Sequence, residues 1–116
     1  MTHATGNEVP VHYFQKLDIR VCKILAIDDF PKARKPLYKL TIDFGELGVK
    51  KTGAGLKQFY SKEKLLDKLA IAVVNFPPRQ IASFRSECLV VAAITKETKT
   101  VLLKPDNETE AGAKIF

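Results

Sequence analysis

The sequence has few of the residues that carry catalytic or metal chemistry. Its 116 residues include two cysteines, two histidines and no tryptophan. Cys22 and Cys88 lie far apart, with no CxxC motif and no neighbouring histidine, which excludes a sequence-encoded zinc site and a disulfide scaffold. His3 and His12 both lie near the N-terminus, and no serine or cysteine has a plausible base beside it. We therefore predict that the protein is not an enzyme and holds no cofactor or metal.

Long apolar runs are also missing. No uncharged apolar stretch approaches the roughly 18–20 residues that a transmembrane helix requires. Residues 1–10 lack the basic region followed by an apolar region that marks a signal peptide. Two cysteines set in apolar segments fit a reducing compartment as buried side chains. We expect a cytoplasmic protein without membrane insertion, and its length fits a single domain.

Positive charge is in excess and is concentrated in one segment. The chain has 19 Lys and Arg against 13 Asp and Glu, a net charge of +6. Residues 32–57 hold seven of these basic residues and only two acidic ones, whereas residues 105–116 hold three acidic residues and one lysine. This asymmetry points to a binding face, although solvated lysines on an outer strand face are the commoner explanation for any single residue.

β-Strand patterns dominate the sequence. Apolar and polar side chains alternate over residues 17–21 and 38–44, as in strands with one buried face. The first alternation slips by one residue after Cys22 and then continues, which predicts a β-bulge in a long, bent strand. Three apolar runs predict further strands: residues 70–76, 88–94 and 100–103. The first two are nearly continuous and predict strands buried on both faces, or nearly so.

The elements between these strands predict the fold. Gly45 and Gly48 bracket a short hairpin turn into a third strand that begins at Val49. Residues 61–68 are strong helix formers behind Ser61, a candidate N-cap, and predict one short helix. Three strands, a helix and further strands is the order of an OB fold, whereas an SH3-like barrel usually lacks the helix. We predict an all-β protein, a five-stranded OB-fold barrel with one short helix between strands 3 and 4.

Apolar pairs near both termini have no obvious place in such a barrel. They are Tyr13-Phe14 and Ile115-Phe116. Exposed apolar surface at both ends predicts terminal extensions that are used for dimerisation.

A double proline at residues 77–78 marks the first candidate binding segment. It cannot continue a central strand and should place Arg79 and the following residues in a long loop at the barrel rim, where OB folds bind ligands. There Arg79 and Arg85 flank Ile81 and Phe84, and arginine beside exposed aromatic rings suits unpaired RNA. The alternative is that Ile81 and Phe84 cap the open end of the barrel and the arginines are merely solvated.

The second candidate segment is the predicted pair of strands that carries Lys39, Lys50 and Lys51. Outward residues on adjacent strands lie roughly 5 Å apart, so these lysines would form a phosphate patch. The Gly53-Ala54-Gly55 segment that follows lacks the spacing of a P-loop. It marks instead a place where the backbone turns tightly or comes close to another group.

Together these residues resemble the CsaA proteins, small homodimeric secretion chaperones with the tRNA-binding-domain OB fold. This fold is shared with the C-terminal domain of many methionyl-tRNA synthetases and with free-standing tRNA-binding cofactors. The resemblance covers residues 12–116 and lies in four runs: Phe14-x-x-Leu17-Asp18-Ile19-Arg20-Val21, Phe30-Pro31-x-Ala33-Arg34-x-Pro36, Asp43-Phe44-Gly45, and above all Asn75-Phe76-Pro77-Pro78-Arg79-x-Ile81-Ala82-x-Phe84-x-Ser86-Glu87-x-Leu89-Val90.

The resemblance also sets the boundaries of the domain. Residues 1–10 have no family counterpart and are expected to form a disordered leader, and residues 11–116 form the tRNA-binding-type domain. CsaA proteins usually have a Ser-Ala-Gln type sequence after the third strand, whereas this chain has Thr52-Gly53-Ala54-Gly55-Leu56, closer to the Ser-Gly-Leu of the synthetase-linked domains. No ligand contact through that glutamine is therefore carried over.

The resemblance implies a homodimer without catalysis, and two ligands are open. The first is tRNA, bound through a basic face by residues that the sequence suggests for phosphate and base contact: Lys39, Lys50, Lys51, Lys57, Asn75, Arg79, Arg85 and Ser86. The alternative is an export chaperone that holds unfolded precursor proteins and passes them to the export motor ATPase, with a peptide-binding groove lined by Gly53, Ala54, Gly55, Phe76 and Phe84. A third possibility is an assembly module of a larger synthetase complex.

Overall fold

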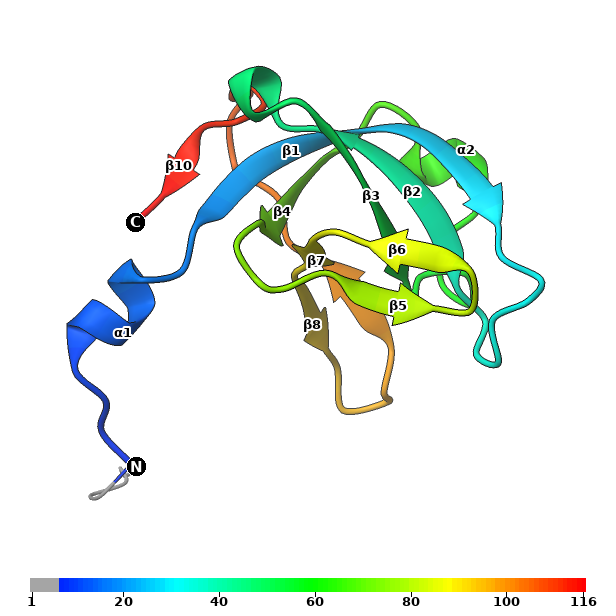
Figure 1. Ribbon diagram of the computed structural model, residues 1–116, viewed down its shortest axis with the longest axis horizontal. Coiled ribbons are helices and arrows are strands. Elements are labelled where there is room, and N and C mark those ends of the chain that lie inside the picture. Colours follow the sequence, from blue (N-terminus) through cyan, green and yellow to red (C-terminus); the bar gives the residue numbers. More distant parts are fainter. Residues whose placement is uncertain (1–6) are drawn as a thin grey trace.

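The computed structural model describes residues 7–116 and is built around one strongly curved sheet (Figure 1). The strand order is β3-β2-β1-β4-β7, and β10 also pairs with β1. The strands of this sheet are β1 (Ile19–Asp29), β2 (Tyr38–Asp43), β3 (Val49–Ala54), β4 (Leu69–Val73), β7 (Leu89–Val90) and β10 (Lys114–Ile115). Two separate hairpins complete the barrel: β5 (Arg79–Ile81) with β6 (Phe84–Ser86), and β8 (Ala92–Ile94) with β9 (Thr100–Leu102).

Three short helical segments connect or flank the strands. They are α1 (Val11–Gln15), the 3-10 helix η1 (Gly45–Leu47) and α2 (Lys62–Leu65). α2 lies between β3 and β4, and Ser61 caps it as predicted, because its hydroxyl accepts a hydrogen bond of 3.3 Å from the Lys64 N–H. The all-β barrel with one helix in this place is confirmed. Within residues 7–116, no helix is long and apolar enough to cross a membrane.

The long strand β1 pairs with three others. Its residues 19–23 pair with β4, residues 23–29 pair with β2, and residues 19–20 pair with β10. The register with β2 shifts between Ile24 and Ala26, so the predicted bulge is present, slightly later than the slip in the sequence. The break in the apolar–polar alternation after Cys22 has a second cause. Val21 and Cys22 point to opposite sides of the strand, and both are buried. β1 is therefore covered on both faces where the three partners meet.

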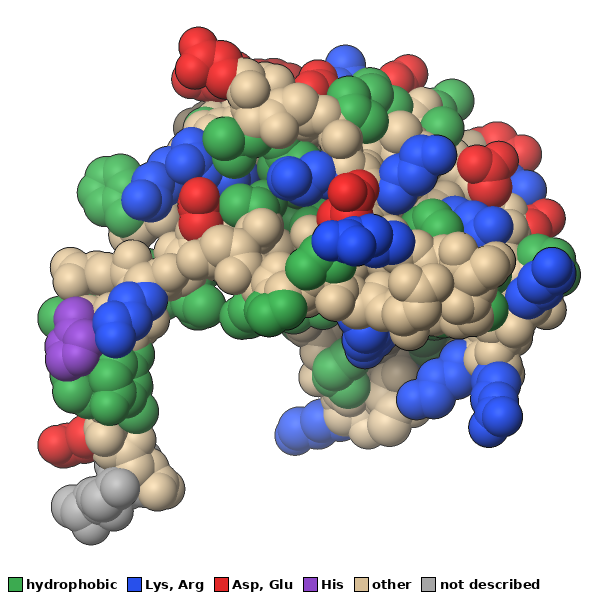
Figure 2. Space-filling view, in the orientation of Figure 1, with side chains coloured by type: hydrophobic (Ala, Val, Ile, Leu, Met, Phe, Trp, Pro, Cys, Tyr) green, Lys and Arg blue, Asp and Glu red, His purple; other side chains and the backbone are tan. Residues whose placement is uncertain are grey.

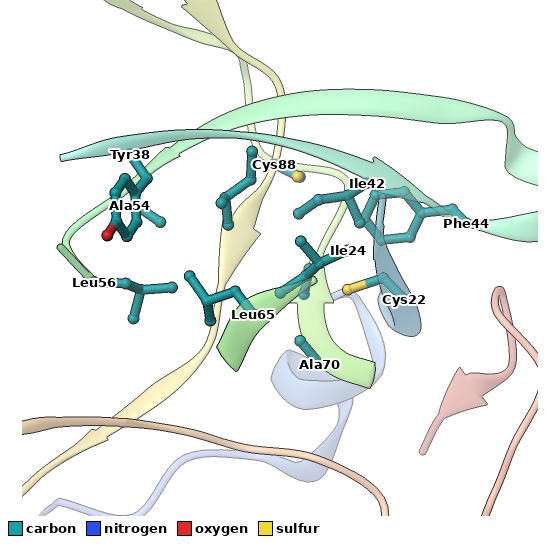
Figure 3. Packing of buried hydrophobic residues seen from close by; sticks show 12 residues of the cluster. Cys22, Ile24, Tyr38, Ile42, Phe44, Ala54, Leu56, Leu65, Ala70 and Cys88 are labelled. Atoms are coloured by element: carbon teal, nitrogen blue, oxygen red, sulfur yellow. The ribbon is translucent and has the colours of Figure 1, made fainter. Parts of the chain in front are cut away.

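The core lies inside the curve of the main sheet (Figure 3). Leu65 of α2 is fully buried and lies between Leu56 and Ile24, so the helix closes one end of the barrel. Thr52 is the buried polar residue at the centre of β3, and its hydroxyl donates to the Cys88 carbonyl at 2.6 Å. The other core members come from β1 to β4, from the residue after β2 and from the segment before β7: Cys22, Tyr38, Leu40, Ile42, Phe44, Ala54, Ala70, Ala72 and Cys88.

The outer edge of β3 is covered by residues 86–88 and not by a full strand. The Glu87 N–H donates to the Lys51 carbonyl at 2.8 Å, and the Glu87 Oε1 accepts from the Lys51 N–H at 2.9 Å. The Ser86 hydroxyl accepts from the Gly53 N–H at 3.1 Å. The side chains of Ser86 and Glu87 therefore satisfy two N–H groups at the β3 edge, and this segment nearly closes the barrel.

Two sequence predictions were wrong in this region. The run 88–94 is not one strand buried on both faces, because it breaks at Val91 into β7 and β8. The Val91 N–H bonds to Ile71 of β4 while its carbonyl accepts from Leu103, so the chain changes partners there, and Leu89 and Ile94 are 51% and 67% exposed. The segment after the double proline is the β5–β6 hairpin and not a long loop.

A C-terminal strap, residues 110–115, crosses the barrel and ends beside α1. The Gly112 N–H donates to the Val21 carbonyl at 2.7 Å, and the Val21 N–H donates to the Ala113 carbonyl at 2.8 Å. Gly112 has a φ of +95°, and a Cβ on it would lie 2.5 Å from the Phe44 carbonyl oxygen. Glycine is required here because both the backbone conformation and the close approach exclude a side chain.

α1 projects away from the barrel and lies near β10 (Figure 1). Its apolar side chains are unburied, with Val11 71% and Tyr13 53% exposed, and Phe116 is fully exposed. α1 and the chain end together line a shallow apolar pocket of about 200 Å³. The predicted exposed apolar surface near both termini is thus present. The predicted leader falls largely on residues 1–6, which lie outside the described residues.

Candidate functional site

Four basic side chains converge on a cleft between the β1–β2 loop and the β5–β6 hairpin. This basic cleft has a volume of about 400 Å³ and is walled by exposed Lys32, Arg34, Lys35 and Arg79 over an apolar floor that includes Ile81. Its lining contains no acidic residue, and within the described part of the chain these four cations form no ion pair. Figure 2 shows Lys and Arg side chains over this lower right region, while acidic side chains lie mainly along the upper half. The basic cleft therefore presents uncompensated positive charge in a concave surface, which attracts anions.

Packing of the hairpin against the barrel forms the cleft. The Phe84 ring of β6 packs against the Phe30 ring at the end of β1, with centroids 5.3 Å apart. Ile81 of β5 lies against Gly53, where a Cβ would come within 3.1 Å of the Ile81 Cδ1. The predicted close backbone approach at Gly53 is confirmed. Because Gly53 has no side chain, the hairpin packs closely against β3, and this packing places Arg79 beside the β1–β2 loop.

Two neighbouring cross-strand pairs of the hairpin face opposite sides. Ile81 pairs with Phe84 in register and both are half-buried against the barrel. Gln80 pairs with Arg85, and both are exposed. Of the two alternatives for this segment, capping of the barrel therefore describes Ile81 and Phe84, while the arginines remain open to a ligand.

A smaller groove adjoins the basic cleft, and Arg79 lines both. This apolar groove has a volume of about 220 Å³ and contains Phe76, Pro77 and Leu89 as its apolar members, with Glu87 as its acidic one. Gly53, Ser86 and Cys88 complete its lining. Anionic ligands in the cleft and flat or apolar groups in the groove would thus be bound side by side.

The predicted lysine patch is arranged differently from the expectation. Lys39 pairs with Gly53 and Thr41 with Lys51, so Lys39 and Lys51 share the outer face of the sheet, whereas Lys50 lies opposite Ile42 on the inner face. The Lys39 Nζ lies 4.8 Å and 5.4 Å from the ring centroids of Phe30 and Phe84. Lys39 therefore helps to hold the hairpin, because a cation over two aromatic faces is attracted by both.

Three other predicted RNA-binding residues have partners within the protein. Lys57 forms an ion pair of 3.4 Å with Asp29, which also pairs with Lys62 at 3.1 Å. The Asn75 side chain donates to the Lys16 carbonyl and accepts from the Asp18 N–H, both at 2.8 Å, and so ties the chain before β1 to the end of β4. Ser86 is buried at the edge of β3. The structure does not bring these residues together with the basic cleft.

The predicted peptide-binding residues are also divided. Phe76 and Gly53 line the apolar groove, whereas the Phe84 ring points from the hairpin toward the barrel and packs against Phe30. Ala54 is buried in the core, and Gly55 is exposed outside the groove.

Sequence reasoning missed Lys32, Arg34 and Lys35 as site residues. They lie in the charged segment 32–57, but the strand alternation in that segment favours Lys39, Lys50 and Lys51. The signal was their spacing, three cations within four residues of the loop that joins the first two strands.

The two cysteines cannot act as nucleophiles in this structure. Burial raises the pKa of Cys22 to about 12 and that of Cys88 to about 11. Both thiols are therefore protonated at neutral pH, and a protonated thiol is a poor nucleophile and metal ligand.

Comparisons with known proteins agree with this architecture. A family model described as "Putative tRNA binding domain" matches residues 19–114. The crystal structure of the CsaA chaperone protein from Picrophilus torridus superimposes with a TM-score of 0.89 at 47% identity, covering 94% of this chain and all of that one. Chaperone CsaA from Bacillus anthracis also gives 0.89, at 38% identity, with 94% and 99% covered. These matches confirm the predicted OB-fold class and the resemblance to CsaA.

Synthetases are also similar, over a small part of their length. The methionine–tRNA ligase of Pyrococcus abyssi is 38% identical over 112 residues, which is 95% of this chain but 15% of the ligase. The ligase of Thermococcus onnurineus is 39% identical over 102 residues, 14% of its length. The chain thus spans only a small fraction of these curated relatives.

Proposed function

The chain belongs to the tRNA-binding-domain family, and from this membership we propose that it binds tRNA through the basic cleft as a non-catalytic protein of the cytoplasm. The observation that carries the proposal is the convergence of Lys32, Arg34 and Lys35 with Arg79 in one concave surface. Phosphate contacts from lysine and arginine supply most of the sequence-independent affinity for nucleic acid. Recognition would therefore follow the shape of the tRNA more than its sequence.

The remaining predicted residues take secondary roles in this proposal. Arg85 and Lys51 are exposed, and they adjoin the two sites through Gln80 of the cleft, which pairs with Arg85, and Glu87 of the groove, which bonds to Lys51; both would extend the phosphate track. Lys39, Asn75 and Ser86 would position the hairpin and the edge of β3 through their internal contacts.

We further propose that two copies associate through α1 and the C-terminal strap. Support comes from the exposed apolar side chains of α1, from the apolar pocket between α1 and the chain end, and from the similarity to the CsaA structures. Sedimentation velocity should give a dimer, and Tyr13→Asp combined with Phe116→Asp should give a monomer with unchanged circular dichroism. A monomeric parent protein would contradict the proposal.

The salt dependence of tRNA binding tests the main proposal. The triple variant Lys32→Ala, Arg34→Ala, Lys35→Ala should bind more weakly, and the slope of log K against log salt should become less negative by roughly two to three, at about 0.7–0.9 for each of three lost phosphate contacts. A matched control removes three exposed lysines outside the cleft: Lys96→Ala, Lys99→Ala and Lys104→Ala. An equal change of slope in both variants would contradict a specific role for the cleft.

A second candidate function is favoured by the apolar groove and by the similarity to proteins described as chaperones. In it, the groove holds apolar side chains of unfolded precursor proteins on their way to the export motor ATPase. The protein would then suppress aggregation of an unfolded substrate equally well at low and high salt, and Phe76→Asp would remove this activity. Suppression that is unaffected by Phe76→Asp would count against the groove as the binding site.

A further inference from the structure

The apolar groove combines an aromatic side chain, a carboxylate and an arginine in one small space. Its volume of about 220 Å³ is below the roughly 300–1,000 Å³ of pockets for drug-sized ligands. It contains an accessible aromatic side chain, since Phe76 is 42% exposed. It also opens toward Arg79, which the groove shares with the basic cleft. A single flat group attached to an anion fits this combination.

Glu87 restricts the chemistry of that group. Its Oε1 accepts the hydrogen bond from the Lys51 N–H, and among residues 7–116 its second carboxylate oxygen has no hydrogen-bond or ion-pair partner. An ionised carboxylate only accepts hydrogen bonds. Glu87 is only half-buried, so a ligand that displaces water from this oxygen must bring a donor to it.

We propose that the apolar groove binds one unpaired nucleobase that carries an exocyclic amine, stacked on Phe76 and donating to Glu87, while Arg79 and the basic cleft hold the adjoining phosphates. This inference rests on the proposed RNA-binding function and deepens it. Cytosine offers an N4 amine to a carboxylate, whereas uracil presents the O4 acceptor at the same position. The groove thus discriminates between two pyrimidines of nearly equal size.

A polypeptide fits the same groove less well. An apolar side chain would leave the free oxygen of Glu87 without a donor, at a cost that grows with desolvation. A lysine or arginine side chain could donate to it, but Arg79 and the three cations of the basic cleft would repel it. An anionic backbone with a donating base meets both conditions.

Fluorescence anisotropy with unstructured oligocytidylate and oligouridylate decamers tests the inference at fixed low salt. The parent protein should bind the cytidine decamer about fivefold more tightly, the low end of the discrimination that a good base contact supplies. Glu87→Gln keeps an oxygen for the Lys51 N–H but replaces the other oxygen with an NH₂ group, so the preference should disappear or reverse toward uridine. Phe76→Ala should weaken both decamers about tenfold through lost stacking. Leu47→Ala, at a residue that is also 42% exposed but lines neither the apolar groove nor the basic cleft, should change neither.

The outcomes separate this inference from the proposed function. Equal affinity of the parent protein for both decamers, with tRNA binding intact, would overturn the inference alone. A cytidine preference that survives Glu87→Gln would also overturn it, as would displacement of the decamer by an unfolded polypeptide in a manner that depends on Phe76. Binding of neither tRNA nor decamers would overturn the proposed function itself.

Discussion

Replacing Gly112 with alanine should detach the C-terminal strap from the barrel. The new methyl group would lie 2.5 Å from the Phe44 carbonyl oxygen, a contact that backbone on both sides cannot relieve without moving the strap. Two hydrogen bonds between Val21 and the strap, of 2.7 Å and 2.8 Å, would be lost with that movement. At about 1 kcal/mol for each bond, the strap contact is worth about 2 kcal/mol.

A second glycine separates this contact from the cost of the backbone conformation. Gly48 also has a positive φ, +87°, but a Cβ there meets nothing within 4 Å. Gly48→Ala should therefore show only the conformational cost, on the order of 1–3 kcal/mol. Gly112→Ala should show a similar cost plus the 2 kcal/mol of the lost hydrogen bonds.

Urea unfolding at a fixed protein concentration measures the difference, because association would otherwise change the apparent stability. Gly45→Ala should behave like Gly112→Ala, since a Cβ there meets the backbone of Ala111 on the other side of the same crossing. The double variant should cost less than the sum of the two, because either change alone already detaches the same strap. Equal free energies of unfolding for Gly48→Ala and Gly112→Ala would refute the reasoning.

Two further predictions concern pH and the hairpin. The pKa values of Cys22 and Cys88 are raised from the ordinary 9.0 to about 12 and about 11, so the folded state keeps its thiol protons longer than the unfolded chain. The free energy of unfolding should fall above about pH 9, and each thiol should contribute up to about 1.4 kcal/mol per pH unit to this fall. Cys88→Ala should reduce the slope of the free energy of unfolding against pH, measured by urea unfolding. Lys39→Gln should lower stability by about 1 kcal/mol through lost cation–π contact while leaving the tRNA salt slope unchanged; a slope change as large as one phosphate contact would contradict this.

The barrel was predictable because its strands follow local patterns. The alternation over residues 38–44 and the helix capped by Ser61 each depend on neighbours in the sequence, and both are confirmed. The run 88–94 was misjudged because an apolar stretch does not reveal where the chain changes partners. That change is decided at Val91 by hydrogen bonds to two different strands, which are tertiary contacts.

The candidate site was predictable in its charge but not in its geometry. The surplus of positive charge in residues 32–57 was visible, yet consecutive Lys50 and Lys51 point to opposite faces and Lys39 is occupied by two rings. The double proline predicts the place of Arg79 at the barrel rim. Its meeting with Lys32, Arg34 and Lys35 depends on how closely Ile81 packs onto Gly53, which no spacing in the sequence encodes.

The covering of the β3 edge by Ser86 and Glu87 also bears on self-association. An open strand edge is a template on which a second chain can add a strand, and long flat edges promote aggregation. Here the Lys51 and Gly53 N–H groups bond to side-chain oxygens, so a foreign strand would have to displace both. Ser86 and Glu87 thus protect the barrel from edge-to-edge polymerisation, which leaves the exposed apolar side chains of α1 as a separate surface for association.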